Sequence, residues 1–208
     1  MPLSNSMKED VNIINYEDAV LIASWRKGKL SSFDALVLKY QKRMLNIAFR
    51  ITGDYEDARE VTQDAFVAAY QKIESFRGES LFYVWLTSIT VNLSRNRLLQ
   101  GQTKRKNEAY SLDCPWPDDE ESASRDHPSP SPSALERLER LDLHEKLLEC
   151  IKGLTDEFRE AIVLKDMQDF SYDEICDILK IRIGTVKSRL SRAREFVKDC
   201  VKRSVGEL

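Results

Sequence analysis

The stretch Phe170–Arg194, FSYDEICDILKIRIGTVKSRLSRAR, carries the clearest structural signal in the chain. Ser171 followed by Glu174 is a capping box, which predicts the start of a helix. The apolar pattern then breaks at residues 180–182, which leave room only for a tight turn. A second helix follows the turn. Two helices joined in this way predict a helix-turn-helix.

The second predicted helix has two different faces. Its inner face is expected to hold the apolar residues Ile183, Val186, Leu190, Ala193 and Val197. Its outer face carries the polar and basic residues Thr185, Lys187, Ser188, Arg189 and Arg192. These are the side-chain types that contact phosphates and the edges of bases.

Charge is segregated around this motif. Residues 180–203 hold nine Lys or Arg and two acids, a net charge of +7, whereas residues 154–177 hold eight acids and two basic residues, a net charge of −6. A helix that approaches DNA would be basic in this way. A basic amphipathic surface helix without a nucleic-acid partner is the alternative interpretation.

The chain has 208 residues, a net charge of −3, 42% apolar and 32% charged residues. This length suits one large or two small domains. Because the whole chain is slightly acidic, DNA binding would have to rest on local basic patches. No apolar run approaches the roughly 18 residues of a membrane span, and the N-terminus lacks a signal-peptide pattern. We therefore expect a cytoplasmic protein.

The cysteines are widely spaced, with no C-x-x-C pair, and the histidines are few: Cys114, Cys150, Cys176 and Cys200, with His127 and His144. No metal site is predicted from this pattern, and the expected state of the thiols is reduced. We also find no set of residues typical of catalysis, so neither an enzyme nor a cofactor is predicted.

The N-terminal half predicts helices only. Residues 1–15 are expected to be disordered, 16–27 to form a short helix, and Ser31 or Ser32 to cap a long one that ends at Gly53. The apolar positions of that long helix have three-four spacing: Phe33, Leu36, Val37, Tyr40, Met44, Ile47, Ala48 and Ile51.

Asp54 is expected to cap a third helix with acidic residues in its first turns and an apolar face at Ala58, Val61, Thr62, Ala65, Phe66, Ala69 and Ile73. A fourth helix is expected from Leu81 to about Leu99. Among its aromatic residues, Phe82 and Trp85 are the expected core members.

A change of composition separates two parts of the chain. Five of the six prolines lie between Pro115 and Pro132, and residues 113–126 have a net charge of −5. We expect a first helical domain at 16–102, a flexible acidic Pro/Ser-rich linker at 103–133, and a second helical domain at 134–208 with the helix-turn-helix. The predicted class is all-α.

Both halves resemble one family, the bacterial RNA polymerase sigma factors of the extracytoplasmic-function group. In the first half the resemblance lies in LNIAFRITGDYEDA (45–58), VTQDAF (61–66), SFRGESLFYVWL (75–86) and VNLSRNRL (91–98). In the second half, GTVKSRLSRAR (184–194) is similar to the family's recognition helix. The order and separation of these motifs make the resemblance specific.

Two positions depart from the family pattern. Lys180 stands where the family often has Gly, and Arg182 stands where it often has Pro. Gly would suit a left-handed residue in the turn, and Pro would suit the first residue of the next helix. Each departure is expected to cost about 1 kcal/mol at most, which leaves the fold prediction unchanged.

The resemblance implies three binding surfaces. One would bind the clamp helices of the polymerase largest subunit: Asp57, Glu60, Val61, Gln63, Asp64 and Phe66. A second would read and melt the minus-ten promoter element: Phe76, Arg77, Ser80, Tyr83, Asn92, Arg95 and Asn96. The third, which would read the minus-thirty-five element, is the basic outer face of the recognition helix: Thr185, Lys187, Ser188, Arg189 and Arg192.

The residue types agree with these roles, although each has a simpler explanation. The acids of the third helix could be a solvated N-terminal turn. The segment 89–107 contains five basic residues and no acid, and with the nearby aromatic residues it suits single-stranded DNA. The linker could be only a tether, or, as the family implies, a polyanion in the RNA-exit channel.

The resemblance implies a promoter-specificity subunit that binds core polymerase, its flap region included, and promoter DNA. An anti-sigma protein would hold it inactive by covering residues 57–66 and the second domain. Self-inhibition is the alternative means of control, with the acidic stretch 154–177 and the basic stretch 180–203 paired between domains. A free-standing helix-turn-helix regulator is the alternative function.

Overall fold

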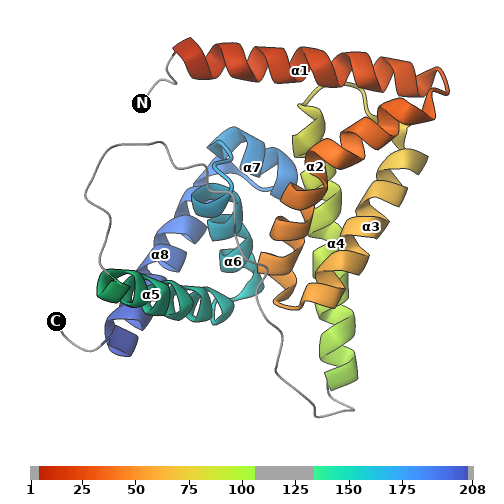
Figure 1. The fold of residues 1–208 in the computed structure, drawn as a ribbon. Helices are drawn as coiled ribbons and strands as arrows, with labels where there is room; N and C mark the ends of the chain where they lie inside the picture. Colours follow the sequence, from red (N-terminus) through yellow and green to blue (C-terminus); the bar gives the residue numbers. More distant parts are fainter. Residues whose placement is uncertain (1–4, 106–133, 206–208) are drawn as a thin grey trace.

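The computed structural model describes residues 5–105 and 134–205, and every regular element within them is helical, as predicted (Figure 1). The predicted linker lies almost entirely outside the described residues. The first group of helices comprises α1 (Asn5–Arg26), α2 (Leu30–Thr52), α3 (Tyr55–Gln71), the 3₁₀ turn η1 (Ile73–Ser75) and α4 (Phe82–Arg105). The second comprises α5 (Ala134–Lys152), α6 (Asp156–Ile162), the π-helical turn η2 (Val163–Met167), α7 (Tyr172–Leu179) and α8 (Ile183–Val205).

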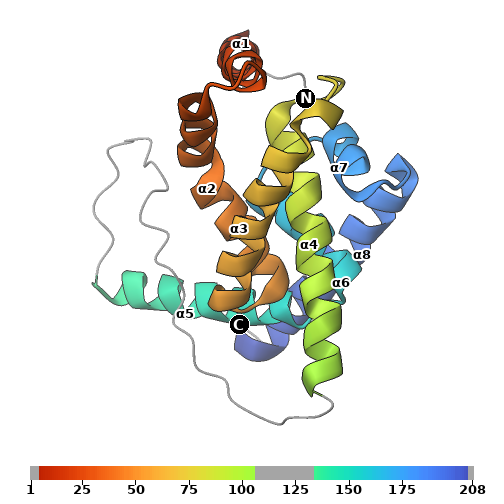
Figure 2. The same cartoon turned by 90° about the vertical axis from the view of Figure 1, so that its right-hand side faces the viewer.

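In the first group, α2, α3 and α4 pack side by side, and α1 crosses one end of them (Figures 1 and 2). The predicted apolar face of α2 forms the centre of the core, with Leu36, Met44 and Ile47 fully buried. At the crossing, the buried carboxylate of Asp18 accepts hydrogen bonds from Lys39 Nζ, at 2.8 Å, and from the Tyr40 hydroxyl. These bonds satisfy a charge that would be costly to bury alone.

The predicted boundary between α2 and α3 is confirmed, whereas the predicted start of α2 is wrong. Gly53 ends α2 with a φ of 76°, and the Asp54 side chain accepts a hydrogen bond from the Asp57 N–H at 2.8 Å, so both predicted signals are confirmed. The predicted serine cap of α2 is wrong. Lys29 precedes the helix without a side-chain cap, and Ser31 and Ser32 lie inside the first turn, where neither can act as the N-cap residue.

The N-terminal helix is longer than predicted. α1 begins at Asn5 rather than at Tyr16, so the expected disorder of residues 1–15 is wrong from Asn5 onward. The sequence of α1 contains neither Pro nor Gly, and nothing in it stops a helix before Gly28, which has a φ of 87°. No helix in the described part of the chain is long and apolar enough to cross a membrane.

The second group forms the predicted helix-turn-helix from α7 and α8. Both bonds of the capping box are present: Ser171 Oγ accepts from the Glu174 N–H at 3.2 Å, and Glu174 Oε2 accepts from the Ser171 N–H at 2.7 Å. Lys180 takes the left-handed conformation that a Gly would suit, with a φ of 56°. The departure from the family pattern therefore leaves the turn geometry intact.

The second domain also contains a disulfide that the sequence analysis did not predict. Cys150 on α5 and Cys200 on α8 are bonded, with their Cα atoms 5.8 Å apart. The structure pairs these two thiols, which were expected to be reduced, whereas Cys176 is free. Sequence spacing could not reveal the pair, because packing of α5 against α8 brings together cysteines 50 residues apart.

Reduction of this disulfide is expected to destabilise the second domain. A cross-link lowers the entropy of the unfolded chain, and a native disulfide typically contributes about 2–4 kcal/mol. Urea unfolding followed by circular dichroism, with and without dithiothreitol, should show a loss of this size. Cys200→Ser should remove the difference, and the control Cys176→Ser should preserve it. Equal stability of oxidised and reduced wild-type protein would contradict the expectation.

Candidate functional site

The acidic turn of α3 is partly neutralised by its own domain. Arg97 on α4 bonds Asp57 Oδ1 through Nε and Glu60 Oε2 through a terminal nitrogen, both at 2.6 Å. The hydrogen bond that Arg97 donates to Asp57 raises the pKa of Arg97. Gln63 and Asp64 are exposed further along the same face. The middle of α3 therefore exposes these two polar side chains of the predicted set.

Two residues of the predicted polymerase-binding set are buried. Val61 is 3% exposed and Phe66 is 7% exposed, because both lie on the face of α3 that packs into the core. Val61 therefore offers almost no surface for direct contact. Phe66 instead contributes to a groove between α2 and α3.

That groove is a feature the sequence analysis missed. It encloses about 530 Å³, and its apolar lining comprises Phe33, Val37, Leu45, Phe66, Val67 and Tyr70. Val67 is 47% exposed and Tyr70 45% exposed. Gln63 stands at its edge, beside Asp64 in sequence. The α2–α3 groove thus combines an apolar floor with a polar rim, as protein-binding surfaces do.

Phe76, predicted to contact DNA, is a core residue. Its ring lies 5.7 Å from that of Phe82 and 5.2 Å from that of Trp85, and its carbonyl oxygen accepts a hydrogen bond from Arg26. Phe82 is buried and Trp85 packs against the core, as predicted. Arg77, which is exposed, and the half-buried Ser80 remain at the surface of the segment that leads into α4.

The other predicted minus-ten residues lie on α4, and two of them contact the second domain. Arg95 Nε and Nη2 donate to the two carboxylate oxygens of Glu160 on α6, at 2.5 and 2.6 Å. The Tyr83 hydroxyl donates to Glu174 on α7, and burial raises the Tyr83 pKa. Asn92 and Asn96 are exposed, and Asn92 accepts a hydrogen bond from Arg95 at 3.3 Å.

Arg43 on α2 makes a third contact between the domains. Its guanidinium carbon lies 4.9 Å from the ring centre of Tyr83 and 4.7 Å from that of Phe170. It also donates to the Gln168 carbonyl oxygen at 2.9 Å. Burial lowers the pKa of Arg43. The sequence analysis missed this residue, because nothing local distinguishes it from a surface arginine beside an apolar helix face.

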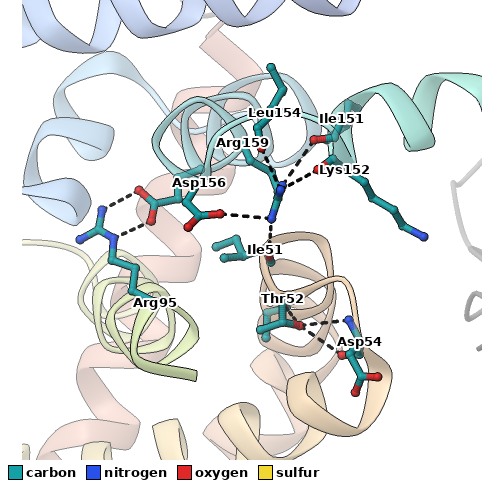
Figure 3. Close-up of polar contacts among 11 residues, drawn as sticks. Ile51, Thr52, Asp54, Arg95, Ile151, Lys152, Leu154, Asp156 and Arg159 are labelled. Carbon is teal, nitrogen blue, oxygen red and sulfur yellow. Dashed lines mark hydrogen bonds and ion pairs between the residues drawn. The ribbon is translucent and has the colours of Figure 1, made fainter. Parts of the chain in front are cut away.

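A fourth contact comes from the second domain. Arg159, on α6, donates to the Ile51 carbonyl oxygen at 3.0 Å, near the C-terminus of α2. The same side chain donates to the carbonyl oxygens of Lys152 and Leu154, at 2.6 and 2.8 Å (Figure 3). It thereby joins the end of α2 to the turn between α5 and α6. This contact was also not predicted.

The recognition helix presents most of the predicted residues to solvent. Lys187, Ser188 and Arg192 are exposed, and Thr185 is half-buried. Arg189 differs, since its side chain is only 15% exposed and pairs with Glu157 on α6 at 2.9 Å. Its predicted place on the open outer face is therefore wrong. Arg189 lies on the edge of α8 that faces α6.

The acidic and basic stretches pair within the second domain. Besides the Arg189–Glu157 pair, Arg194 donates to both carboxylate oxygens of Asp166, at 2.6 and 2.9 Å. The acids that reach the first domain, Glu160 and Glu174, contact Arg95 and Tyr83. The alternative prediction, in which these two stretches pair between the domains, is therefore wrong. Among the described side chains, no group of three or more His, Cys, Asp or Glu could hold a metal ion.

Comparison with known proteins agrees with this architecture. Residues 36–104 match the family described as Sigma-70 region 2, and residues 144–197 match Sigma-70, region 4. The chain is 32% identical over 182 residues to RNA polymerase sigma-H factor of Pseudomonas aeruginosa, covering 87% of this chain and 92% of that protein. It is 35% identical over 183 residues to the ECF RNA polymerase sigma-E factor of Escherichia coli K12, covering 86% and 92%.

Solved structures share the fold. The sigma factor RpoE of Bartonella quintana, in complex with the anti-sigma factor NepR, gives a TM-score of 0.63 at 24% identity, over 82% of this chain and 96% of that one. CnrH, in complex with the cytosolic domain of CnrY, gives 0.64 at 21%, over 90% and 98%. The two family matches and the identities of 32% and 35% show that the chain belongs to the extracytoplasmic-function sigma factors, which direct initiation of transcription.

Proposed function

We propose that this sigma factor binds core polymerase through α2 and α3, opens the minus-ten element with α4, and reads the minus-thirty-five element with α8. The observation that carries the proposal is the presence of region 2 and region 4 in one chain, in that order. A free-standing helix-turn-helix regulator would not need a region 2. We assign residues 16–102 and 134–208 to the two functional domains.

The α2–α3 groove and the exposed polar residues in the middle of α3 support the assignment to polymerase. An apolar floor with exposed Val67 and Tyr70 can accept a partner's side chains. Gln63 lines the groove, Asp64 is exposed next to it in sequence, and both can bond basic and polar groups of a partner. This revises the expected set, since Val61 acts only by holding α3 in place. Glu60 is paired with Arg97 in this structure. It can bind polymerase once Arg97 is released or is shared with the partner surface.

The surface of α4 supports binding of the melted minus-ten strand. Arg95 supplies a cation for phosphate, Tyr83 supplies a ring for stacking, and the exposed Asn92 and Asn96 supply donors and acceptors for base edges. Arg77 and Ser80 lie at the approach to the same surface. Phe76 has a supporting role in the aromatic core.

The protein is proposed to act in the cytoplasm, without catalysis and without a cofactor. Its proposed partners are core polymerase, promoter DNA and an anti-sigma protein, the last by analogy with the RpoE–NepR complex. The surfaces expected to bind an anti-sigma protein are α3 around residues 57–66 and the second domain.

Transcription in vitro tests the proposed function directly. The purified chain is added to bacterial core polymerase, and promoters are first located by sequencing transcript 5′ ends after overexpression. We expect promoter-dependent transcripts only when both components are present. Strong sequence-specific promoter binding by the chain alone, with no effect of core polymerase, would favour the free-standing regulator instead.

Reversal of charge at Asp64 is expected to prevent polymerase binding. In Asp64→Arg, a positive side chain would meet a basic partner surface, and such like-charge contacts cost several kcal/mol, so affinity should fall by on the order of 100-fold or more. Glu145→Arg, the same reversal on the exposed side of α5, is the control and should bind normally. Retention of the Asp64→Arg variant by immobilised core polymerase would remove this face from the interface.

Loss of the Arg192 side chain is expected to weaken recognition of the upstream element. A base-reading arginine contributes about 1–3 kcal/mol, so Arg192→Ala should lower holoenzyme affinity for the mapped promoter by roughly 5- to 150-fold and relax one base position. Arg203→Ala, near the distal end of α8, serves as the control. A loss that is uniform over all promoter sequences would instead identify Arg192 as a phosphate contact.

A further inference from the structure

The α4 surface proposed to bind the minus-ten strand is already occupied by the second domain. Both nitrogens of Arg95 that would hold a phosphate are bonded to the Glu160 carboxylate, at 2.5 and 2.6 Å. The Tyr83 hydroxyl is bonded to Glu174, and its ring lies 5.6 Å from that of Phe170. A carboxylate and a phosphate compete for the same donors, so this arrangement and DNA binding exclude each other.

The contact is a built interface rather than a chance approach of two charges. Glu160 is only 1% exposed, so its charge is enclosed and satisfied by Arg95. Arg43 of the first domain is stacked against Tyr83 and Phe170 and donates to Gln168. Arg159 of the second domain donates to the carbonyl oxygen of Ile51 in the first. Each domain thus supplies arginines that bond groups of the other. Figure 2 shows α7 beside α4, and α2 contacts η2 and α6.

The recognition helix is not covered in the same way. Lys187, Ser188 and Arg192 are exposed, whereas Arg95 and Tyr83 of α4 are bonded to the second domain, and Asn92 and Asn96 stay exposed. The closed arrangement therefore occupies the cation and the stacking ring of one promoter-reading surface and leaves the other surface open. A protein wedged between the domains is not required for this, since the domains bond each other directly.

We propose that the free chain closes on itself, with Glu160 and Glu174 in place of the DNA strand on α4. Glu160, Glu174 and Arg43 form the closing contact. The minus-thirty-five surface stays accessible, and Arg95 and Tyr83 of the minus-ten surface become free to bind DNA only when the domains separate. This inference rests on the proposed role of α4, and its consequence for domain arrangement can be measured independently of that role.

The test removes the two carboxylate charges without disturbing the fold. In Glu160→Gln/Glu174→Gln, position 174 keeps its capping box, because Gln serves there as well as Glu. Glu145→Gln/Glu149→Gln makes the same charge change at exposed positions of α5 and is the matched control. Circular dichroism checks that each variant is folded, and Arg43→Ala is a second variant that opens the same interface from the other domain.

Small-angle X-ray scattering reports the arrangement, and fluorescence anisotropy reports access to α4. The DNA probe is a fluorescein-labelled pool of random single-stranded oligonucleotides, without polymerase. We expect a compact wild-type chain and a larger radius of gyration for the opened variants and for wild type in 1 M salt, where the screening length is about 3 Å. If the closed fraction is about 90%, opening should tighten binding of the pool about tenfold.

Adding Arg95→Ala to the opened variant should abolish that gain, because the gain must come from uncovered α4. An extended wild-type chain at low salt, or unchanged dimensions in both opened variants, would overturn the proposal. Opening without tighter DNA binding would also overturn it. That last result would place the failure in the assignment of α4 to DNA, whereas the sigma function itself is judged separately by transcription with core polymerase.

Discussion

The bond between Arg95 and Glu160 is the interaction on which the arrangement of the two domains depends. An ionised carboxylate is costly to bury unless a charged partner and full hydrogen bonding accompany it, and Glu160 has both only when α4 lies against α6. Removing one partner of such a pair costs about 3–5 kcal/mol, because the other charge stays buried. Separation of the domains has a lower cost than removal of one partner, because both charges then return to water. The pair can therefore specify the closed arrangement while adding little to its stability, which suits a contact that has to open.

Local signals in the sequence predicted the elements of the fold well, because each element carries its own start, stop and apolar period. The Ser171–Glu174 capping box, Gly53 after α2 and Asp54 before α3 all act within a few residues, and all are confirmed. The errors arose where a local signal competed with packing. Ser32 is a good cap by residue type but lies inside the first turn of α2, where it is buried. The segment after Asn5 is polar enough to be called disordered, yet it lacks any residue that stops a helix.

The surfaces were harder to predict than the helices, because exposure depends on neighbours distant in sequence. Phe76 and Val61 match residue types expected at the interfaces but belong to the core, and Arg189 is held by Glu157 on another helix. Arg43, Gln168 and Arg159 gave no local signal, because their roles exist only once the two domains meet. The disulfide between Cys150 and Cys200 was missed for the same reason. The acidic character of residues 154–177 was visible in the sequence, but not which of its acids contact the first domain.

The central claim is that α4 exchanges the acids of the second domain for promoter DNA. An experimental structure of the chain bound to core polymerase and promoter DNA tests it most directly, through the separation of the Arg95 guanidinium and the Glu160 carboxylate. The account predicts that the bonds of 2.5 and 2.6 Å are absent from that complex and that Arg95 contacts the minus-ten strand. Persistence of the pair, with DNA bound elsewhere on the first domain, would contradict it.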